Sequence, residues 1–344
     1  MSFETINDLS QKNYNALLFL VLKSINEKDK YKDLEKKVLL ELQKDLSLIH
    51  FQNEDLSSKK RVFLTCNWCS STQLMNLWNK MSKDNNYTWN DIRIVDQEPC
   101  DFYCIINRPS SDDFVHDPER TVIFRMEPYM EKDEKQWGKW TNPDVNLYKF
   151  VGNHNLHYNN NEWHLKKTYQ ELMNDTIVKN EEYSNVLSTI LSEKYKDPGH
   201  IKRIDFIKYI EQKLEVHVYG SNQYLYKNYK HPLPPYEKDE SLIPYKYGFN
   251  VENHSIKNYY TEKIIDGILS ETLMFYSGCF NLKDYIDERA FVYLELSNFE
   301  HDLGIIKKAM EEDWYTQRLP YIKEAKQKIL NELQFFPRLE KILE

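Results

Sequence analysis

The chain has 344 residues and a formal net charge of −8, and 41% of its residues are hydrophobic. This length suits two domains of ordinary size, and this apolar content excludes a fully disordered protein. The acidic balance provides no overall attraction for nucleic acid, so we expect no nucleic-acid partner.

The N-terminal part of the chain is polar and predicted to be helical. The first residues, MSFETINDLSQ, are acidic where a secretory signal needs basic and then apolar residues. Residues 1–55 read as a helical N-terminal extension, and leucines recur on one helical face of residues 30–49. No apolar run there approaches the roughly 20 residues of a spanning helix. We expect a cytoplasmic protein, free or peripheral to a membrane, without a signal peptide, anchor or transmembrane segment.

Short apolar runs follow, and they predict an α/β domain over residues 56–182. The runs are separated by helical or loop stretches and lie at residues 61–66, 92–95, 102–106 and 122–126. Buried parallel strands have this pattern, and their alternation with other segments favours an α/β layer. Residues 131–167 are polar and aromatic with little apolar periodicity, so we predict loops and short helices there.

A second α/β domain is predicted over residues 183–315. Residues 185–191 read as a strand, 201–214 as an amphipathic helix, and 216–220 as a strand that ends in Gly220. This is a βαβ unit, which closes right-handed and binds ligands at the carboxyl ends of its strands. Strands at 247–251 and 273–276 flank a helix that starts near residue 261. Long charged helices are predicted from 305 to 343, and residues 316–344 form a C-terminal helical segment.

Several familiar site motifs are absent from this sequence. It contains neither GxGxxG nor GxxxxGK[ST], so a usual dinucleotide or P-loop site is excluded. It also lacks HExxH and an Asp-x-Asp pair, and we predict no metal site. Cys66 and Cys69 form a lone CxxC, for which reduced structural thiols are favoured over metal or redox chemistry.

Two basic residues lie near predicted helix starts in the second domain. Arg203 is near the start of helix 201–214, and Lys263 is in the first turn of the next helix, beside Glu262. Helix N-termini present free N–H groups and partial positive charge, so these cations suit a diphosphate. Glu262 would repel phosphate but could accept hydrogen bonds from ribose hydroxyls. Periodicity alone favours the alternative that Glu262 and Lys263 are solvated first-turn residues.

The stretch YKYGFNVENHSIKNYYTEKIIDGILSETLMFYSG, residues 245–278, resembles the signature of the α-1,3-fucosyltransferases, glycosyltransferase family ten. Glu252-Asn253 match the E-N of that signature, and residues 259–263 match its Y-V-T-E-K at the same separation. The helix that carries Arg203 and the strand end at residues 219–221 are also similar to the family. The resemblance covers about residues 185–335.

This resemblance implies a GT-B-like α/β fold: two Rossmann-like domains facing a cleft, with N-terminal and C-terminal helical segments. Family members transfer L-fucose from GDP-fucose to a hydroxyl of an acceptor glycan or glycoprotein, inverting the anomeric centre. The nucleotide sugar is the donor substrate, and no cofactor is required. The donor-binding residues implied are Arg203, Tyr219, Gly220, Asn250, Glu252, Asn253, Tyr259, Thr261, Glu262 and Lys263.

An inverting displacement also needs a base that takes the proton of the acceptor hydroxyl. Glu127 follows the apolar run 122–126 directly, in a place comparable to that of a family glutamate, and it is our candidate; a structural carboxylate is the alternative. Arg125 could pair with it or stabilise phosphate charge, but an outward-facing surface arginine is the favoured interpretation. Trp68 could stack on an acceptor sugar or pack at a domain edge.

Two departures from the family pattern leave the donor sugar open. Met274 stands where the family usually has proline, and Ser277 replaces a common aromatic or polar residue. A transferase that uses another nucleotide-activated 6-deoxyhexose is therefore an alternative. A non-catalytic glycan- or nucleotide-binding protein is another, although retention of Arg203, Glu262 and Lys263 together argues against it.

Overall fold

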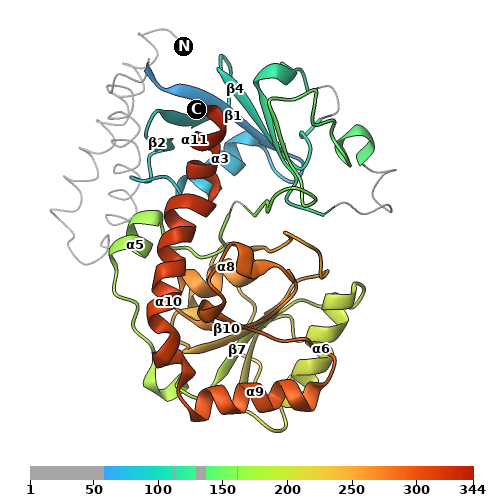
Figure 1. Ribbon diagram of the computed structural model, residues 1–344, viewed down its shortest axis with the longest axis vertical. Helices are drawn as coiled ribbons and strands as arrows, with labels where there is room; N and C mark the ends of the chain where they lie inside the picture. Colours follow the sequence, from blue (N-terminus) through green and yellow to red (C-terminus); the bar gives the residue numbers. More distant parts are fainter. Residues whose placement is uncertain (1–57, 112–113, 129–136, 161) are drawn as a thin grey trace, which may run out of the picture. The chain divides into compact units, whose positions relative to one another are not determined.

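The computed structural model describes residues 58–344 except 112–113, 129–136 and 161. The predicted helical extension at residues 1–55 lies outside this part. The described chain forms two sheets of mainly parallel strands, with helices between successive strands (Figure 1). None of the described helices combines the length and the apolarity that crossing a bilayer requires.

The first sheet has the strand order β2-β3-β1-β4-β5-β6, and all pairs are parallel except β2 with β3. Its strands are β1 (Lys60–Cys66), β2 (Thr88–Trp89), β3 (Ile92–Val95), β4 (Phe102–Ile106), β5 (Thr121–Phe124) and β6 (Phe150–Gly152). The four apolar runs are confirmed as strands. The loop prediction for residues 131–167 is wrong at β6, because three residues that include a glycine give no periodic signal.

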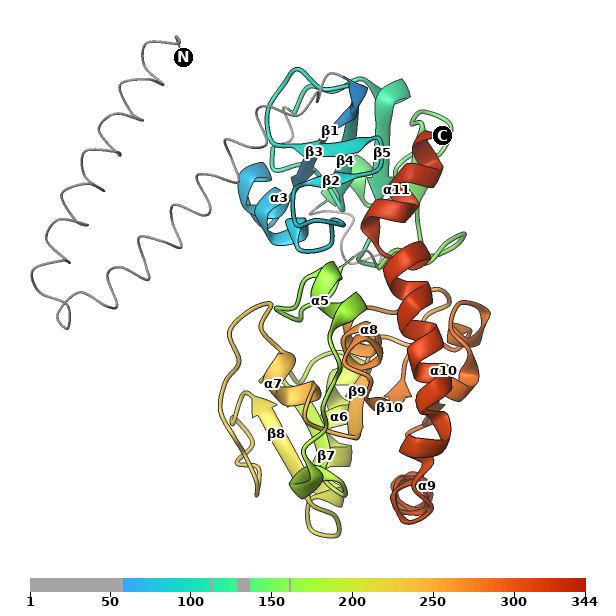
Figure 2. The same cartoon turned by 90° about the vertical axis from the view of Figure 1, so that its left-hand side faces the viewer.

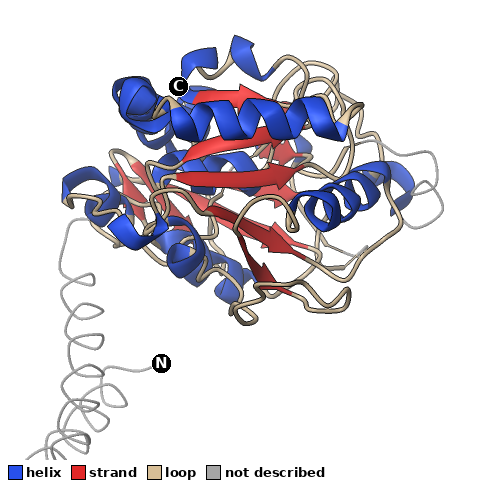
Figure 3. Ribbon diagram, turned by 90° about the horizontal axis from the view of Figure 1, so that it is seen from below, coloured by secondary structure: helices blue, strands red, loops and turns tan. Residues whose placement is uncertain are grey.

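The second sheet has the order β11-β10-β9-β7-β8, and its strands are all parallel. Its strands are β7 (Leu187–Leu191), β8 (Val216–Gly220), β9 (Tyr247–Val251), β10 (Leu273–Ser277) and β11 (Phe291–Tyr293). Figure 3 shows helices on both faces of the strands, which explains why the strand residues are almost all buried. The four predicted strands are confirmed.

The two sheets share one topology. When β2 is left out and the parallel strands of each sheet are renumbered in chain order, both read 2-1-3-4-5. The strand order reverses between β1 and β4 in the first sheet and between β7 and β9 in the second. Ligands of doubly wound sheets bind outside the carboxyl ends of the strands at such a reversal. The fold therefore marks the ends of β7 and β9 as a binding position.

The helices that bear on this position start where local chemistry favours a helix. Helix α6 begins at Pro198, after Asp197, and not at residue 201, because proline fits the first helical turn. Helix α8 begins at Glu262 after the N-cap Thr261, as predicted. The α-helices are α3 (Ser71–Asn79), α5 (Tyr169–Asn174), α6 (Pro198–Ile210), α7 (Asp239–Leu242), α8 (Glu262–Leu269), α9 (Phe299–Glu311), α10 (Trp314–Lys328) and α11 (Phe335–Leu343).

Short turns of other helix types complete the described secondary structure. The 3₁₀ turns are Pro118–Arg120, Gly138–Trp140, Glu181–Tyr183, Leu282–Asp284 and Glu288–Ala290, and a π-helical turn spans Ile329–Leu333 between α10 and α11. The predicted C-terminal run of helices is thus confirmed, although it begins at Phe299 and not at residue 305.

The C-terminal helices return the chain to the first sheet. Helix α10 runs from α9 toward α11 (Figure 2) and packs on α8 and β10 of the second sheet. Helix α11 packs on the first sheet, where the Phe335 ring lies 4.7 Å from that of Trp78 and the Arg338 guanidinium 4.8 Å from the ring centre of Phe124. The last residues of the sequence therefore complete the core of the first sheet.

Candidate functional site

Arg203 lies at the reversal between β7 and β9. Its Nη1 donates to the carbonyl oxygen of Val251 (3.2 Å) and to Asn253 Oδ1 (3.3 Å), and its Nη2 donates to Ser192 Oγ (3.0 Å). Only 4% of the residue is exposed, and Nε has no hydrogen-bond partner among the described residues. Burial lowers the pKa of the guanidinium, while the carboxylate of Glu252 opposes that shift. The arginine sits in the second turn of α6 and links the ends of the two strands.

Glu252 follows β9 and joins three elements through one buried carboxylate. Its Oε1 accepts from the backbone N–H of Thr261 (2.8 Å) and from the hydroxyl of Tyr276 (3.2 Å). Its Oε2 accepts from Thr261 Oγ1 (2.8 Å) and lies 3.4 Å from Lys263 Nζ. The ends of β9 and β10 and the start of α8 are therefore held together by this side chain.

Two glycines allow the close packing around Glu252. A Cβ at Gly199, in the first turn of α6, would lie 1.7 Å from the carbonyl oxygen of Glu252. A Cβ at Gly278 would lie 2.5 Å from Glu252 Cγ, and Gly278 has φ +155. Only glycine fits at either place. The sequence holds only eight glycines, and two of them pack against one residue of this site.

The Lys263 side chain points toward Thr261 and the carboxylates of Glu252 and Glu262. Its Nζ lies 3.0 Å from Thr261 Oγ1 and 3.4 Å from both Glu262 Oε1 and Glu252 Oε2, and only 15% of its side chain is exposed. Burial lowers the pKa of the ammonium, but Glu262 and Glu252 raise it further, so the net shift is upward and the group stays charged. The alternative that Lys263 is a solvated surface residue is wrong.

Glu262 forms ion pairs with two lysine ammonium groups through the same carboxylate oxygen. Its Oε1 lies 3.4 Å from Lys263 Nζ and 3.3 Å from Lys238 Nζ, and 19% of its side chain is exposed. Burial raises the pKa of this carboxyl group, but Lys263 and Lys238 lower it more, and the net pKa is well below the usual range. Glu262 is therefore ionised. The sequence analysis missed Lys238, because its stretch HPLPPYEK has no periodic pattern.

Glu127 belongs to the first sheet and interacts electrostatically with Lys263 and Glu262 of the second. It lies three residues beyond the end of β5, not directly after the strand, and its backbone N–H donates to Asn107 Oδ1 (3.0 Å). Solvent reaches its side chain. The surrounding protein nevertheless raises the pKa of its carboxyl group by desolvation; Lys263 lowers that pKa, and Glu262 raises it.

His154 connects the backbone next to Glu127 with the backbone next to Tyr259. Its Nε2 lies 3.1 Å from the carbonyl oxygen of Met126, and its Nδ1 lies 3.2 Å from that of Asn258. The His154 ring meets the buried ring of Tyr259 edge-on at 5.2 Å. Burial lowers the pKa of His154 to about 4, although both carbonyl contacts raise it. The neutral imidazole carries one N–H and therefore donates to one of the two carbonyl oxygens. His154 thus links the segment that carries the candidate base with the segment that carries Tyr259, a predicted donor-binding residue.

Three predicted donor-binding residues make their described contacts elsewhere. The Tyr219 hydroxyl lies 2.8 Å from that of Tyr245 in a separate core cluster. Asn250 Oδ1 accepts from the backbone N–H of Val251 (3.2 Å). Gly220 has φ +92, and a Cβ there would meet the carbonyl oxygen of Leu191 at 2.3 Å. These contacts explain the three residues as packing and turn residues.

The remaining sequence candidates lie in the first sheet. Arg125 is 2% exposed, its guanidinium donates to the carbonyl oxygen of Trp140, and it lies 4.4 Å from the ring centre of Trp137, so the outward-facing interpretation is wrong. Trp68 is 41% exposed in the loop after β1. Cys66 and Cys69 are free thiols whose Sγ atoms lie 3.5 Å apart.

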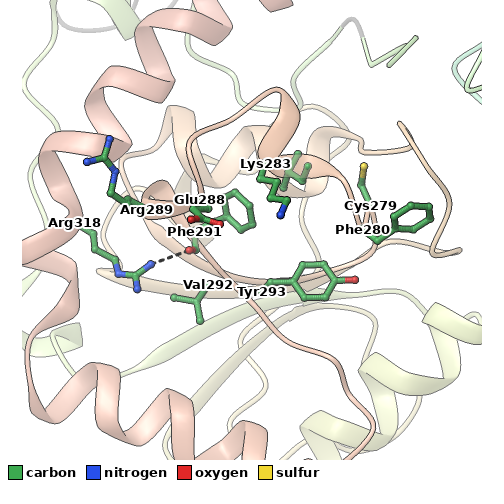
Figure 4. Close-up of a pocket in the computed structure, with 10 residues that line it drawn as sticks. Cys279, Phe280, Lys283, Glu288, Arg289, Phe291, Val292, Tyr293 and Arg318 are labelled. Atoms are coloured by element: carbon green, nitrogen blue, oxygen red, sulfur yellow. Dashed lines mark hydrogen bonds between the residues drawn. The ribbon is translucent and has the colours of Figure 1, made fainter. Parts of the chain in front are cut away.

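A cavity of about 410 Å³ lies beside the edge strand β11 and contains none of the predicted site residues (Figure 4). Lys283 and Tyr293 point into it, and Arg318 at its edge donates to the carbonyl oxygen of Phe291 (2.9 Å). Arg289, which also lines the cavity, is paired with Asp287. Neither Arg203 nor Lys263 is among the lining residues.

No protein-family model and no curated protein sequence matches the chain. Two solved structures of an α-glucosyltransferase in complex with UDP and a 13-mer DNA are similar to it. One contains a central A:G mismatch (9% identity, TM-score 0.52) and one an HMU base (11% identity, TM-score 0.51), and each comparison covers 83% of this chain and 100% of the other. An α1,3-fucosyltransferase with GDP has 17% identity over 81% of this chain and 93% of its own, with a TM-score of 0.46. The chain has the GT-B glycosyltransferase fold, as predicted.

Proposed function

We propose that this protein is an inverting glycosyltransferase that moves L-fucose from GDP-fucose to a hydroxyl of an acceptor glycan or glycoprotein. One observation carries the proposal: Arg203 and Lys263 converge with Glu252 and Glu262 at the carboxyl ends of β7 and β9, and Glu127 interacts with the same charges. Two cations, Arg203 and Lys263, at the strand-order reversal of a doubly wound sheet suit a nucleotide diphosphate.

The two cations have the right chemistry for a leaving diphosphate. Arg203 is held by three hydrogen bonds, and its buried Nε–H has no acceptor among the described residues. Lys263 adds a compact charge at the start of α8, where the helix dipole also favours an anion. Both groups are fixed before the reaction, so they stabilise the negative charge that develops as the diphosphate leaves.

Glu127 acts as the base that activates the acceptor hydroxyl. The acceptor oxygen attacks the anomeric carbon of the sugar, the bond from that carbon to the diphosphate oxygen breaks, and the hydroxyl proton passes to the Glu127 carboxylate. A carboxyl group with a raised pKa is a better base near neutral pH than an ordinary glutamate. Replacement of Glu127 by glutamine keeps the shape and removes the base.

The choice of L-fucose and GDP rests on the resemblance of residues 245–278 to the fucosyltransferases. Ligands that bind the folded protein raise its apparent melting temperature. We expect GDP and GDP-fucose to raise it more than UDP, UDP-glucose or ADP-glucose at equal concentration. If the melting temperature rose only with another GDP-deoxysugar, that sugar nucleotide would replace GDP-fucose as the proposed donor. If it rose with no nucleotide, the result would contradict the proposal.

Turnover separates an enzyme from a binding protein. In the wild type we expect release of GDP from GDP-fucose that depends on an acceptor glycan, and at least a 100-fold loss of that rate in Glu127→Gln with GDP affinity unchanged. Nucleotide binding with no turnover on any donor and acceptor tested would favour the non-catalytic alternative.

A further inference from the structure

Lys238 is a third cation at this site, and it belongs to none of the sequence motifs that predict the site. We propose that Lys238 is a positioning residue: it fixes the Glu262 carboxylate so that it recognises the ribose hydroxyls of the nucleotide. The proposal rests on the proposed function, in which Glu262 contacts the ribose. Lys238 itself need not touch the ligand.

The ammonium of Lys238 is clamped between two carboxylates on one face of α8. Its Nζ lies 3.3 Å from Glu262 Oε1 and 3.0 Å from Asp266 Oδ2. Glu262 and Asp266 are four residues apart, so their side chains project from the same side of the helix. The Asp266 side chain is 1% exposed and that of Lys238 is 15% exposed. The buried Asp266 carboxylate therefore fixes the Lys238 ammonium, and that ammonium in turn fixes the Glu262 carboxylate.

This clamp orients the carboxylate of Glu262. Lys238 and Lys263 both contact Oε1. Two cations on one oxygen restrain rotation of the carboxylate and keep it ionised. A carboxylate held in one orientation accepts from a sugar hydroxyl at a fixed angle, which is what recognition of that hydroxyl requires.

The backbone of Lys238 is fixed as well. Its N–H donates to the carbonyl oxygen of His164 (3.1 Å), and the N–H of His164 donates to Asp266 Oδ1 (2.7 Å). His164 thus bridges the two partners that hold Glu262 in place. The lysine is positioned before any nucleotide binds, so binding does not have to order it.

The test compares the affinities of GDP and 2′-deoxy-GDP by titration calorimetry. A site built around a ribose hydroxyl rejects an analogue that lacks it. For the wild type we expect GDP to bind about 10-fold more tightly than 2′-deoxy-GDP, a difference of about 1.4 kcal/mol. In Lys238→Met we expect the ratio to fall to about 2 or less. Glu262→Gln should have the same low ratio, and adding Lys238→Met to it should lower the ratio no further.

Lys326→Met is the matched control. Lys326 is also buried and also paired with a carboxylate, Glu271, at 2.8 Å, but it lies away from Glu262. The Lys326→Met variant should be less stable than the wild type but should keep the wild-type ratio of GDP to 2′-deoxy-GDP affinity. If Lys238→Met fails to fold because Asp266 is left without its cation, Lys238→Met with Asp266→Asn removes that buried charge, and the ratio is read from the double variant.

The outcomes are distinguishable. A wild-type ratio in folded Lys238→Met, or a wild type that does not discriminate between the two nucleotides, overturns the role of Lys238. A wild type that binds neither GDP nor UDP overturns the proposed function itself. A ratio that falls in Lys238→Met but not in Lys326→Met supports the proposal.

Discussion

Replacing Glu252 by glutamine should destabilise the second sheet more than loss of one ion pair would suggest. The carboxylate is fully buried and accepts from Thr261 twice and from Tyr276 once, beside the Lys263 ammonium. A glutamine keeps one acceptor oxygen and turns an NH₂ group toward the remaining donors. Losing one or two charge-assisted bonds costs about 2–4 kcal/mol. Lys263 retains Glu262 as a partner, so the loss should not exceed that of a broken buried pair.

Urea unfolding followed by tryptophan fluorescence measures this change. Glu252→Gln should lower the unfolding midpoint at an unchanged m-value. The control is Glu300→Gln, which also breaks a Lys–Glu pair, with Lys213 at 2.7 Å, but on an exposed side chain. It should leave the midpoint where it is, because exposed pairs contribute little. Equal midpoints for the two variants would refute the reasoning that the burial of Glu252 decides its contribution.

Three further outcomes follow from the described charges. Lys263→Met should weaken GDP binding by about 10- to 100-fold in calorimetry, and unchanged affinity would remove Lys263 from the diphosphate site. Because the pKa of Glu127 is raised, kcat/KM should fall tenfold per pH unit on an acid limb that lies above pH 4.5; a limb at or below that pH would contradict its role as base. The unfolded chain takes up a proton near pH 6.5, whereas folded His154, whose pKa is about 4, does not. His154 should therefore contribute a loss of about 2 kcal/mol from pH 7 to 5, and the total loss should be smaller by about that amount in His154→Asn; identical losses in urea titrations would exclude this contribution.

The strands were the most predictable part of this fold. Eight of them were predicted, the clearest from short apolar runs such as FYCII in β4, and burial on both faces of a parallel sheet produces that signal directly. Strands β2, β6 and β11 were not predicted, because edge strands of two or three residues have no room for a pattern. The predicted start of α8 is correct because Thr261 provides the N-cap chemistry next to the apolar stripe.

The site was only partly predictable. Arg203 and Lys263 could be found because helix starts and charges are local features of the sequence. Lys238 and His154 could not, because each matters through contacts with residues 24 or more positions away. Arg125 was misread for the same reason: the partners that bury it come from a segment without periodicity.

The return of α11 to the first sheet means that the chain passes between the two sheets twice, once after β6 and once through the π-helical turn Ile329–Leu333. Glu127 follows β5 of the first sheet and Lys263 lies in the first turn of α8 of the second. Any change in how the two sheets are arranged would therefore bend both passages and alter the separation between the candidate base and the diphosphate site.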